Sequence, residues 1–185
     1  MIGLTSTRMT DQTLIIEFQS GNAKEQAFTQ LLKRHRETVF FQIKKMVLEH
    51  ADADDIAQAV WIKVWNKLDG FKHESAFSTW LFRIAYNETL NFIAQKKRIK
   101  NQTKQILVEQ EMEHPSTKNG INESAIQIKL ERAIAELPEK QRFVFMLRYF
   151  EAYDYEKIAS ITGTTVGGAK ANYHQAVKKM TEFIQ

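Results

Sequence analysis

The chain has 185 residues, of which 43% are hydrophobic and 26% are charged, and this composition is typical of an ordinary globular protein. Its length allows one compact domain or two small ones. It contains no cysteine, which excludes disulfides and thiolate metal sites and fits a cytoplasmic location. The amino-terminal residues lack a signal-peptide pattern, and no apolar run approaches the roughly 18 residues that cross a membrane, so no membrane insertion is expected. Met1 and Met9 are both candidate starts, because the first periodic segment begins at Thr10.

The formal charge of +4 is small, but its distribution along the chain is uneven. Residues 1–94 hold 11 basic and 11 acidic side chains, whereas residues 96–104 hold five basic side chains and no acidic one. A second acid-free stretch separates Glu156 from Glu182. The distribution of charge is therefore more informative than the total.

Helical periodicity recurs along the first half of the sequence, with no convincing strand pattern and no internal repeat. Gly21 and Gly70 are predicted to end two helices, and Asp52 and Ser75 are predicted to cap two others at their amino ends. The predicted helices cover residues 11–19, 24–49, 52–68 and 76–97. The last of them carries a predicted buried stripe of Phe77, Leu81, Ile84, Ala85 and Phe92.

The periodicity fades over residues 98–124, where proline, glycine, serine and asparagine form a turn-rich mixture. We interpret this stretch as a flexible linker, with loose helix over residues 101–112 as an alternative. The expected fold is therefore all-α, with two small helical domains over residues 9–97 and 125–185.

Helical spacing resumes in the second half, beginning with Ile126 and Leu130. A new helix is predicted from Pro138, because the missing N–H of proline costs nothing in a first turn. Its buried stripe is predicted to be Phe143, Leu147 and Phe150. A short helix is then predicted from a cap at Asp154 to Ile161, with Gly163 ending it, and a final helix from a cap at Thr164 or Thr165.

The final predicted helix has two distinct faces. Its basic, acid-free face holds Lys170, His174 and Lys178. The short preceding helix and the tight turn, with Ala159 and Gly163 four residues apart, are typical of a helix-turn-helix, whose second helix enters the major groove of DNA. The apolar face should pack on the preceding helices and comprises Val166, Ala169, Tyr173, Ala176, Val177, Met180 and Ile184.

The chemistry of this face favours DNA, because DNA is a line of negative charge that a carboxylate would repel. Gly167 and Gly168 would let the start of the helix approach a phosphate, which the free N–H groups and the helix dipole attract. Each glycine costs about 1 kcal/mol relative to alanine inside a helix. A solvated lysine face on an ordinary carboxy-terminal helix is the alternative that spacing alone leaves open.

Two stretches in this order resemble bacterial RNA polymerase sigma factors. Region 2 of that family is similar to DADDIAQAVWIKVWNKLDGF followed by FSTWLFRIAYNETLNFIAQKKR. Region 4 is similar to LPEKQRFVFMLRYFEAYDYEKIASITGTTVGGAKANYHQAVKKM. The order, the linker and the short length resemble the extracytoplasmic-function (ECF, group 4) subfamily, which keeps only these two domains. The resemblance covers about residues 10–95 and 125–183.

The resemblance implies that the helix over residues 52–68 grips the clamp helices of the polymerase β′ subunit. Trp61 is expected to belong mainly to the core, whereas spacing leaves the role of Trp65 open. Ala59 departs from the family, because relatives often carry glutamate there. The residues expected to bind the polymerase are Asp55, Gln58, Ile62 and Trp65.

The resemblance also implies that residues 71–87 read the downstream (minus-10) promoter element, with the loop FKHES holding a flipped base. An unpaired base needs a stacking surface and polar edges. Trp80 has core packing as its alternative role, and Asn87 has solvation of a helix face. The residues expected to contact this element are Phe71, Lys72, His73, Trp80, Arg83, Asn87, Lys96, Lys97 and Arg98.

Region 4 is implied to read the upstream (minus-35) element with the last helix. Many relatives carry arginine where this chain has Asn172 and Gln175. Arginine pairs with guanine in a bidentate way, whereas Asn and Gln prefer adenine, so a shifted promoter preference is predicted. The residues expected to contact this element are Thr165, Gly167, Gly168, Lys170, Ala171, Asn172, His174, Gln175, Lys178 and Lys179.

An enzymatic function is not expected, and neither is a metal or another cofactor. The segment around Gly167 lacks the leading glycine, the strand and the Ser/Thr of a phosphate-binding loop, and the five histidines show no metal spacing. The implied partners are core RNA polymerase, through its β′ clamp helices and β flap, promoter DNA and an anti-sigma factor. The rival hypothesis is an autonomous helix-turn-helix regulator that binds duplex DNA without polymerase. A protein that has lost DNA binding is disfavoured by the basic face over residues 170–179.

Overall fold

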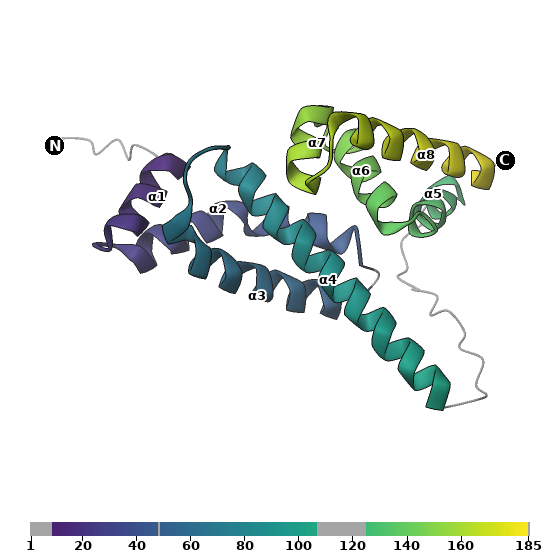
Figure 1. Cartoon of the computed structure of the whole chain (residues 1–185), viewed down its shortest axis with the longest axis horizontal. Helices are drawn as coiled ribbons and strands as arrows, with labels where there is room; N and C mark the ends of the chain where they lie inside the picture. Colours follow the sequence, from purple (N-terminus) through teal and green to yellow (C-terminus); the bar gives the residue numbers. More distant parts are fainter. Residues whose placement is uncertain (1–8, 48, 107–124, 185) are drawn as a thin grey trace. The chain divides into compact units, whose positions relative to one another are not determined.

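The computed structural model describes residues 9–47, 49–106 and 125–184, and every regular element in these ranges is helical (Figure 1). The all-α class expected from the sequence is confirmed. The chain separates into two compact units, residues 1–88 and 89–185, and the division falls within the longest helix. The elements are α1 (Asp11–Ser20), α2 (Lys24–Lys44), α3 (His50–Lys67), the short 3-10 helix η1 (Leu68–Gly70), α4 (Phe77–Ile106), α5 (Ala125–Ala135), α6 (Glu139–Tyr149), α7 (Tyr155–Thr162) and α8 (Val166–Ile184).

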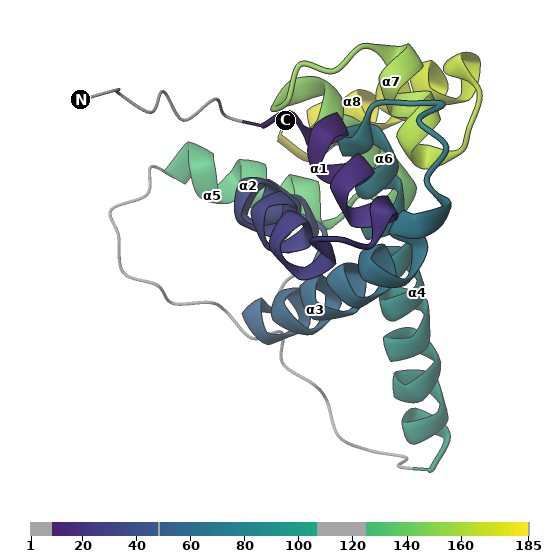
Figure 2. The ribbon, with the colours of Figure 1, turned by 90° about the vertical axis from the view of Figure 1, so that its left-hand side faces the viewer.

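The first unit is a bundle in which α1 packs on α2 and α2 packs on α3, with η1 against α1 and α3 (Figure 2). Local signals explain its boundaries. The hydroxyl of Thr10 accepts a hydrogen bond from the Thr13 amide at 3.2 Å, and Gly21 ends α1 with a φ of 83°. The fully buried side chains of this core include Leu14, Phe18, Leu31, Ile56, Leu68 and Leu81.

Several helix boundaries of the first unit differ from the prediction. The second helix ends at Lys44, and α3 begins at His50, so Asp52 lies in the first turn instead of capping it. The helix dipole stabilises a carboxylate in the first turn as well as at the cap, which is why Asp52 marks the start of the helix two residues too late. The fourth helix begins at Phe77, where Ser75 Oγ lies 3.5 Å from the carbonyl oxygen of Ala76 and makes no bond to an amide of the first turn.

The fourth helix continues to Ile106, well beyond the predicted end at Lys97. Residues 98–106 were assigned to the linker and are helical. They contain no glycine or proline, and lysine, arginine and glutamine are good helix formers, so nothing in this stretch stops the helix. The rest of the predicted linker, residues 107–124, lies outside the described residues.

The second unit packs α5, α6 and α7 against α8, with α6 and α7 also in contact. The carboxylate of Asp154 accepts from the Lys157 amide at 2.7 Å, and Gly163 ends α7 with a φ of 67°, both as predicted. The core cluster comprises Ala133, Leu137, Phe145, Met146, Ala176 and Met180.

Two expected core residues of this unit are exposed. Phe150 is 45% exposed and Val177 is 38% exposed, whereas Phe143 and Leu147 are buried as predicted. Phe150 is the C-cap residue that follows α6, so it lies just beyond the helix whose buried stripe the pattern predicts. The side chains of Ile126 and Ile184 lie outside the described residues.

Candidate nucleic-acid interface

The outer face of α3 carries the four residues expected to bind polymerase. Ala53, Ile56, Val60 and Val64 bury the inner face, which turns Asp55, Gln58, Ile62 and Trp65 outward, and Ile62 is 64% exposed. A single exposed apolar side chain is common on protein surfaces, so Ile62 is informative only together with Trp65, which is exposed one helical turn further along α3.

The two tryptophans of α3 have different roles in packing. Trp61 is half-buried, with its ring 5.9 Å from the Phe28 ring, edge to face. Trp65 packs edge-on against Phe18 at 5.1 Å and Phe28 at 5.0 Å, yet remains 36% exposed. It therefore supports the core with one edge and offers the rest of its surface to solvent.

The loop between η1 and α4 is anchored from inside. The ring of Phe71 is only 6% exposed and lies 5.1 Å from the Trp80 ring and 4.9 Å from the His73 ring. The side-chain amide of Gln19 donates to the carbonyl oxygens of Leu68 at 3.1 Å and Phe71 at 3.0 Å. Phe71 was expected to offer a stacking surface, but its burial assigns the ring to the loop's anchor, because it closes the core beneath the loop.

The loop residues beyond Phe71 are exposed. His73 has a left-handed φ of 57°, which is uncommon for a residue with a side chain and sharply turns the loop. Lys72 and His73 are exposed and Trp80 is half-buried, so these side chains are the ones that remain accessible.

A hollow of about 300 Å³ lies in the second unit and a larger one of about 660 Å³ borders the loop of the first. The larger hollow includes Asp11, whose carboxylate accepts hydrogen bonds from Arg34 and, at 2.8 Å, from His35. Arg34 also donates to the carbonyl oxygen of Met9 at 2.7 Å. No sequence motif marks this cluster, because its members come from separate segments of the chain.

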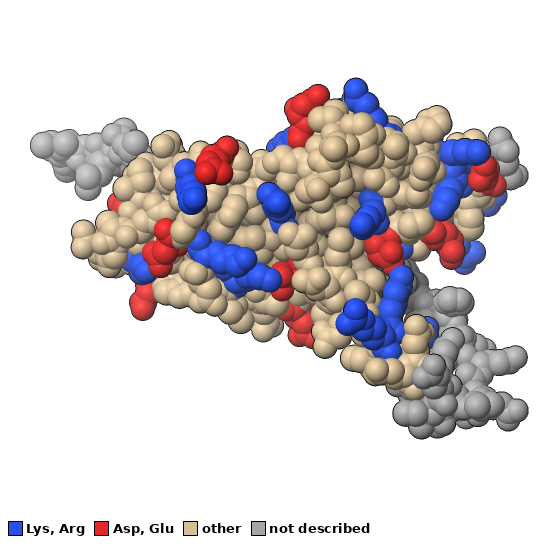
Figure 3. Space-filling view, viewed as in Figure 1, with Lys and Arg blue, Asp and Glu red and all other residues tan. Residues whose placement is uncertain are grey.

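The outer surface of α4 is polar and then basic. Arg83 and Asn87 are exposed one helical turn apart, as the sequence predicts. Further along, Lys96, Lys97 and Arg98 are exposed, and Figure 3 shows lysine and arginine side chains over the carboxy-terminal half of this helix.

The last helix presents the expected basic face. Its inner face buries Ala169, Ala176 and Met180 against the rest of the unit. Gly168 and Asn172 are half-buried at the edge of the face. The other eight predicted contact residues are exposed: Thr165, Gly167, Lys170, Ala171, His174, Gln175, Lys178 and Lys179.

The two glycines at the start of α8 have different surroundings. The hydroxyl of Thr165 accepts from the Gly168 amide at 3.0 Å, so Thr165 is the cap that the sequence left undecided between two threonines. A Cβ on Gly168 would lie 3.2 Å from that hydroxyl oxygen, whereas a Cβ on Gly167 would have no neighbour closer than 3.9 Å. Gly168 therefore gives room to the cap, and Gly167 leaves the outer surface of the first turn open.

Several residues of the face have partners that the sequence did not reveal. The Asn172 side-chain amide donates to the Gly168 carbonyl oxygen at 2.9 Å. Gln141 Nε2, on α6, donates to Gln175 Oε1 at 2.7 Å. The ammonium group of Lys170 lies 5.7 Å from the centre of the Tyr155 ring, within reach of a cation–π contact.

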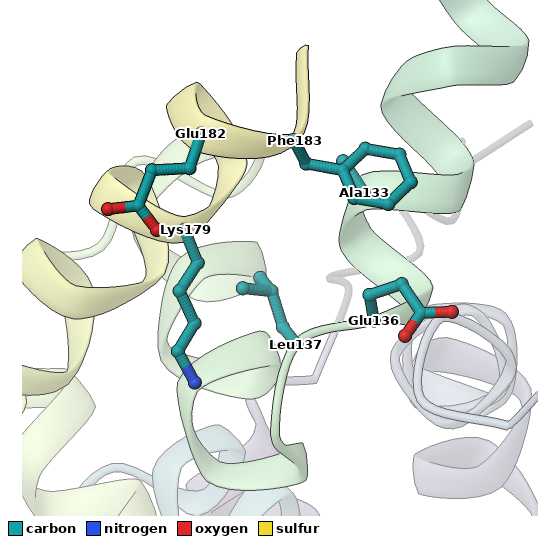
Figure 4. Close-up of a pocket in the computed structure, with 6 residues that line it drawn as sticks. All are labelled: Ala133, Glu136, Leu137, Lys179, Glu182 and Phe183. Carbon is teal, nitrogen blue, oxygen red and sulfur yellow. The ribbon is translucent and has the colours of Figure 1, made fainter. Parts of the chain in front are cut away.

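The smaller hollow lies beside α8, where the Phe183 ring leans toward Ala133 of α5 (Figure 4). Lys179, Glu182, Glu136 and Leu137 complete its lining. Within residues 9–47, 49–106 and 125–184, no group of three or more His, Asp or Glu side chains could hold a metal ion. In the same ranges, no helix is long and apolar enough to cross a membrane.

Together, these features define a helical DNA-recognition protein in which a helix-turn-helix and a separate bundle with an exposed loop belong to one chain. Comparison with known families identifies the class. Residues 31–99 match "Sigma-70 region 2" and residues 127–180 match "Sigma-70, region 4". The chain belongs to the sigma-70 family of RNA polymerase sigma factors, in its ECF group.

Individual relatives are similar to this chain in sequence along nearly its whole length. The chain is 30% identical over 188 residues to the ECF RNA polymerase sigma-E factor of Escherichia coli strain K12, with 97% of each chain covered. It is 28% identical to the RNA polymerase sigma-H factor of Pseudomonas aeruginosa, with 97% of this chain and 96% of that one covered. The fold is similar to that of the sigma factor RpoE of Bartonella quintana, solved with the anti-sigma factor NepR, at a TM-score of 0.66 and 24% identity, with 85% of this chain and 96% of that chain covered.

Proposed function

We propose that this sigma factor directs initiation by dividing promoter recognition between its two helical regions. Residues 9–97 bind the β′ clamp helices of core RNA polymerase and the minus-10 element, and residues 125–185 bind the minus-35 element and the β flap. Residues 98–124 connect them. The observation that carries the proposal is the exposed, acid-free face of α8, preceded by a capped turn and a short helix.

The polymerase contact falls on the outer face of α3. Asp55 and Gln58 supply polar groups, and Ile62 and Trp65 supply apolar surface that the bundle leaves uncovered. A central apolar side chain within a polar rim is the composition of an interface core. Ala59 lacks the carboxylate that relatives often carry there, so the contact at this position relies on Ile62 and Trp65 as its apolar part.

The minus-10 contact falls on the loop after Phe71 and on α4. His73 and the exposed edge of Trp80 offer stacking surfaces, while Arg83 and Asn87 offer polar edges for unpaired bases. Lys72, Lys96, Lys97 and Arg98 neutralise phosphates. The buried ring of Phe71 acts through the loop that it anchors.

The chain itself performs no chemistry in this proposal, acts in the cytoplasm and needs no cofactor. An anti-sigma factor is the expected regulator. The B. quintana sigma factor of similar fold was solved in complex with such a partner.

The proposal is tested by run-off transcription with purified core polymerase and a genomic promoter library, with and without this chain. New start sites that share two spaced elements are the expected result. The control variant is Lys170→Glu, which places a carboxylate on the docking face of α8 and should abolish the upstream preference. No new transcripts, with tight binding of the chain alone to duplex DNA, would refute the polymerase-dependent mechanism.

A further inference from the structure

The side chain of Gln175 is held by a residue outside the recognition helix. Gln141, on α6, donates from Nε2 to Gln175 Oε1 at 2.7 Å. Gln141 is half-buried, and its own Oε1 is buried with no hydrogen-bond partner in the described part of the chain. The NH₂ end of the Gln141 amide is therefore the end that meets α8.

This bond fixes which end of the Gln175 amide faces outward. A side-chain amide has one acceptor oxygen and one NH₂ group, pointing in different directions. Because the oxygen of Gln175 is turned toward α6, the NH₂ group is the end that a ligand of α8 meets. Asn172 has the opposite arrangement, since its NH₂ group, and not its oxygen, is engaged within the protein, donating to the Gly168 carbonyl oxygen at 2.9 Å.

The orientation matters because base pairs differ in the donors and acceptors of the major groove. Adenine is read by one amide that both donates and accepts. With its oxygen turned toward Gln141, Gln175 meets the groove with its NH₂ group and acts there as a donor. Guanine presents two acceptors and thymine one, whereas the cytosine edge presents a donor.

We infer that Gln141 is a positioning residue that sets the base preference of Gln175, toward guanine or thymine and against cytosine. This inference rests on the proposed function, because it requires α8 to read the upstream element. It also replaces, at this one position, the adenine preference that the sequence alone predicts.

The test is run-off transcription by holoenzyme from a promoter library whose upstream element is randomised, with wild type, Gln175→Ala, Gln141→Leu and Gln141→Glu. The position of the upstream element at which Gln175→Ala removes the base preference is the position that Gln175 reads. There the wild type should select guanine or thymine over cytosine by about tenfold, within the range measured for single base contacts.

The two Gln141 variants move the preference in different directions. Leucine frees the Gln175 oxygen, so selection should shift to adenine. Glutamate only accepts, takes the NH₂ group of Gln175 and turns its oxygen outward, so selection should shift to bases with an outward amino group, cytosine and adenine. A merely structural role of Gln141 would lower transcript yield without changing which base is selected.

Each remaining outcome is decisive. If Gln175→Ala flattens one position and neither Gln141 variant changes the base selected there, Gln141 does not position Gln175. If Gln175→Ala flattens no position, Gln175 reads no base and the inference is overturned with it. If the wild type yields no upstream element, the proposed function itself fails. Thermal unfolding of each variant verifies folding, and leucine suits this half-buried site, so Gln141→Leu suffices should the glutamate variant unfold.

Discussion

Replacing Ile62 with alanine separates polymerase binding from stability. The side chain is 64% exposed in the free chain. Complete burial of an isoleucine is worth about 1.5–3 kcal/mol, so about two thirds of that, roughly 1–2 kcal/mol, is still to be gained when a partner covers it. The affinity for core polymerase should therefore fall by about 5- to 30-fold in Ile62→Ala. Because alanine is a better helix former and little packing is lost, the free energy of unfolding should change by less than about 0.5 kcal/mol.

The matched control is Val64→Ala on the same helix. Val64 is fully buried, so its truncation should lower the free energy of unfolding by about 2 kcal/mol while the outer face of α3 stays intact. Affinity for core polymerase is measured by competition binding with fluorescence anisotropy as the readout. The free energy of unfolding is measured by urea unfolding. An Ile62→Ala chain that loses stability but binds polymerase like the wild type would refute the assignment of this face.

Three further predictions concern the DNA-binding face and the cluster of Asp11, Arg34 and His35 beside the loop. Gly167→Ala should raise the free energy of unfolding by up to about 1 kcal/mol, because the site is open, and yet weaken minus-35 binding by crowding the phosphate; tighter DNA binding would contradict this. Lys170→Gln should reduce the slope of log affinity against log salt by about one and weaken all promoters alike, as measured by filter binding over a salt series; an unchanged slope would remove Lys170 from the phosphate contacts. Asp11→Asn should lower the free energy of unfolding in urea by about 1–2 kcal/mol, because Arg34 and His35 lose their charged acceptor. A free energy of unfolding equal to that of the wild type would show that these ion pairs do not stabilise the fold.

Much of the architecture could be predicted from the sequence because its signals are local. Apolar residues at spacings of three and four mark the helices, and Gly21, Asp154 and Gly163 act at the helix ends as their chemistry predicts. The helix-turn-helix was recognisable for the same reason, since its turn, its cap and its basic face all lie within residues 154–180.

The rest depended on neighbours that no local pattern specifies. Phe150 fits a helical stripe and is still exposed, because α6 ends one residue before it. Phe71 looked like a stacking surface and is an anchor, because the core reaches beneath its loop. The bond between Gln141 and Gln175 joins residues 34 positions apart, and only the packing of α6 on α8 brings them together.

The buried ring of Phe71 has a consequence for the timing of promoter opening. Because Phe71 is fixed in the core and its carbonyl oxygen is tied to Gln19, the start of the loop has already lost conformational entropy when the chain folds. That part of the loop needs no further ordering when DNA arrives. If the loop receives the base, the rate of capture depends on how often the DNA strand exposes that base. Promoters whose duplex opens more readily at this position are then favoured, in addition to those that make better contacts with the protein.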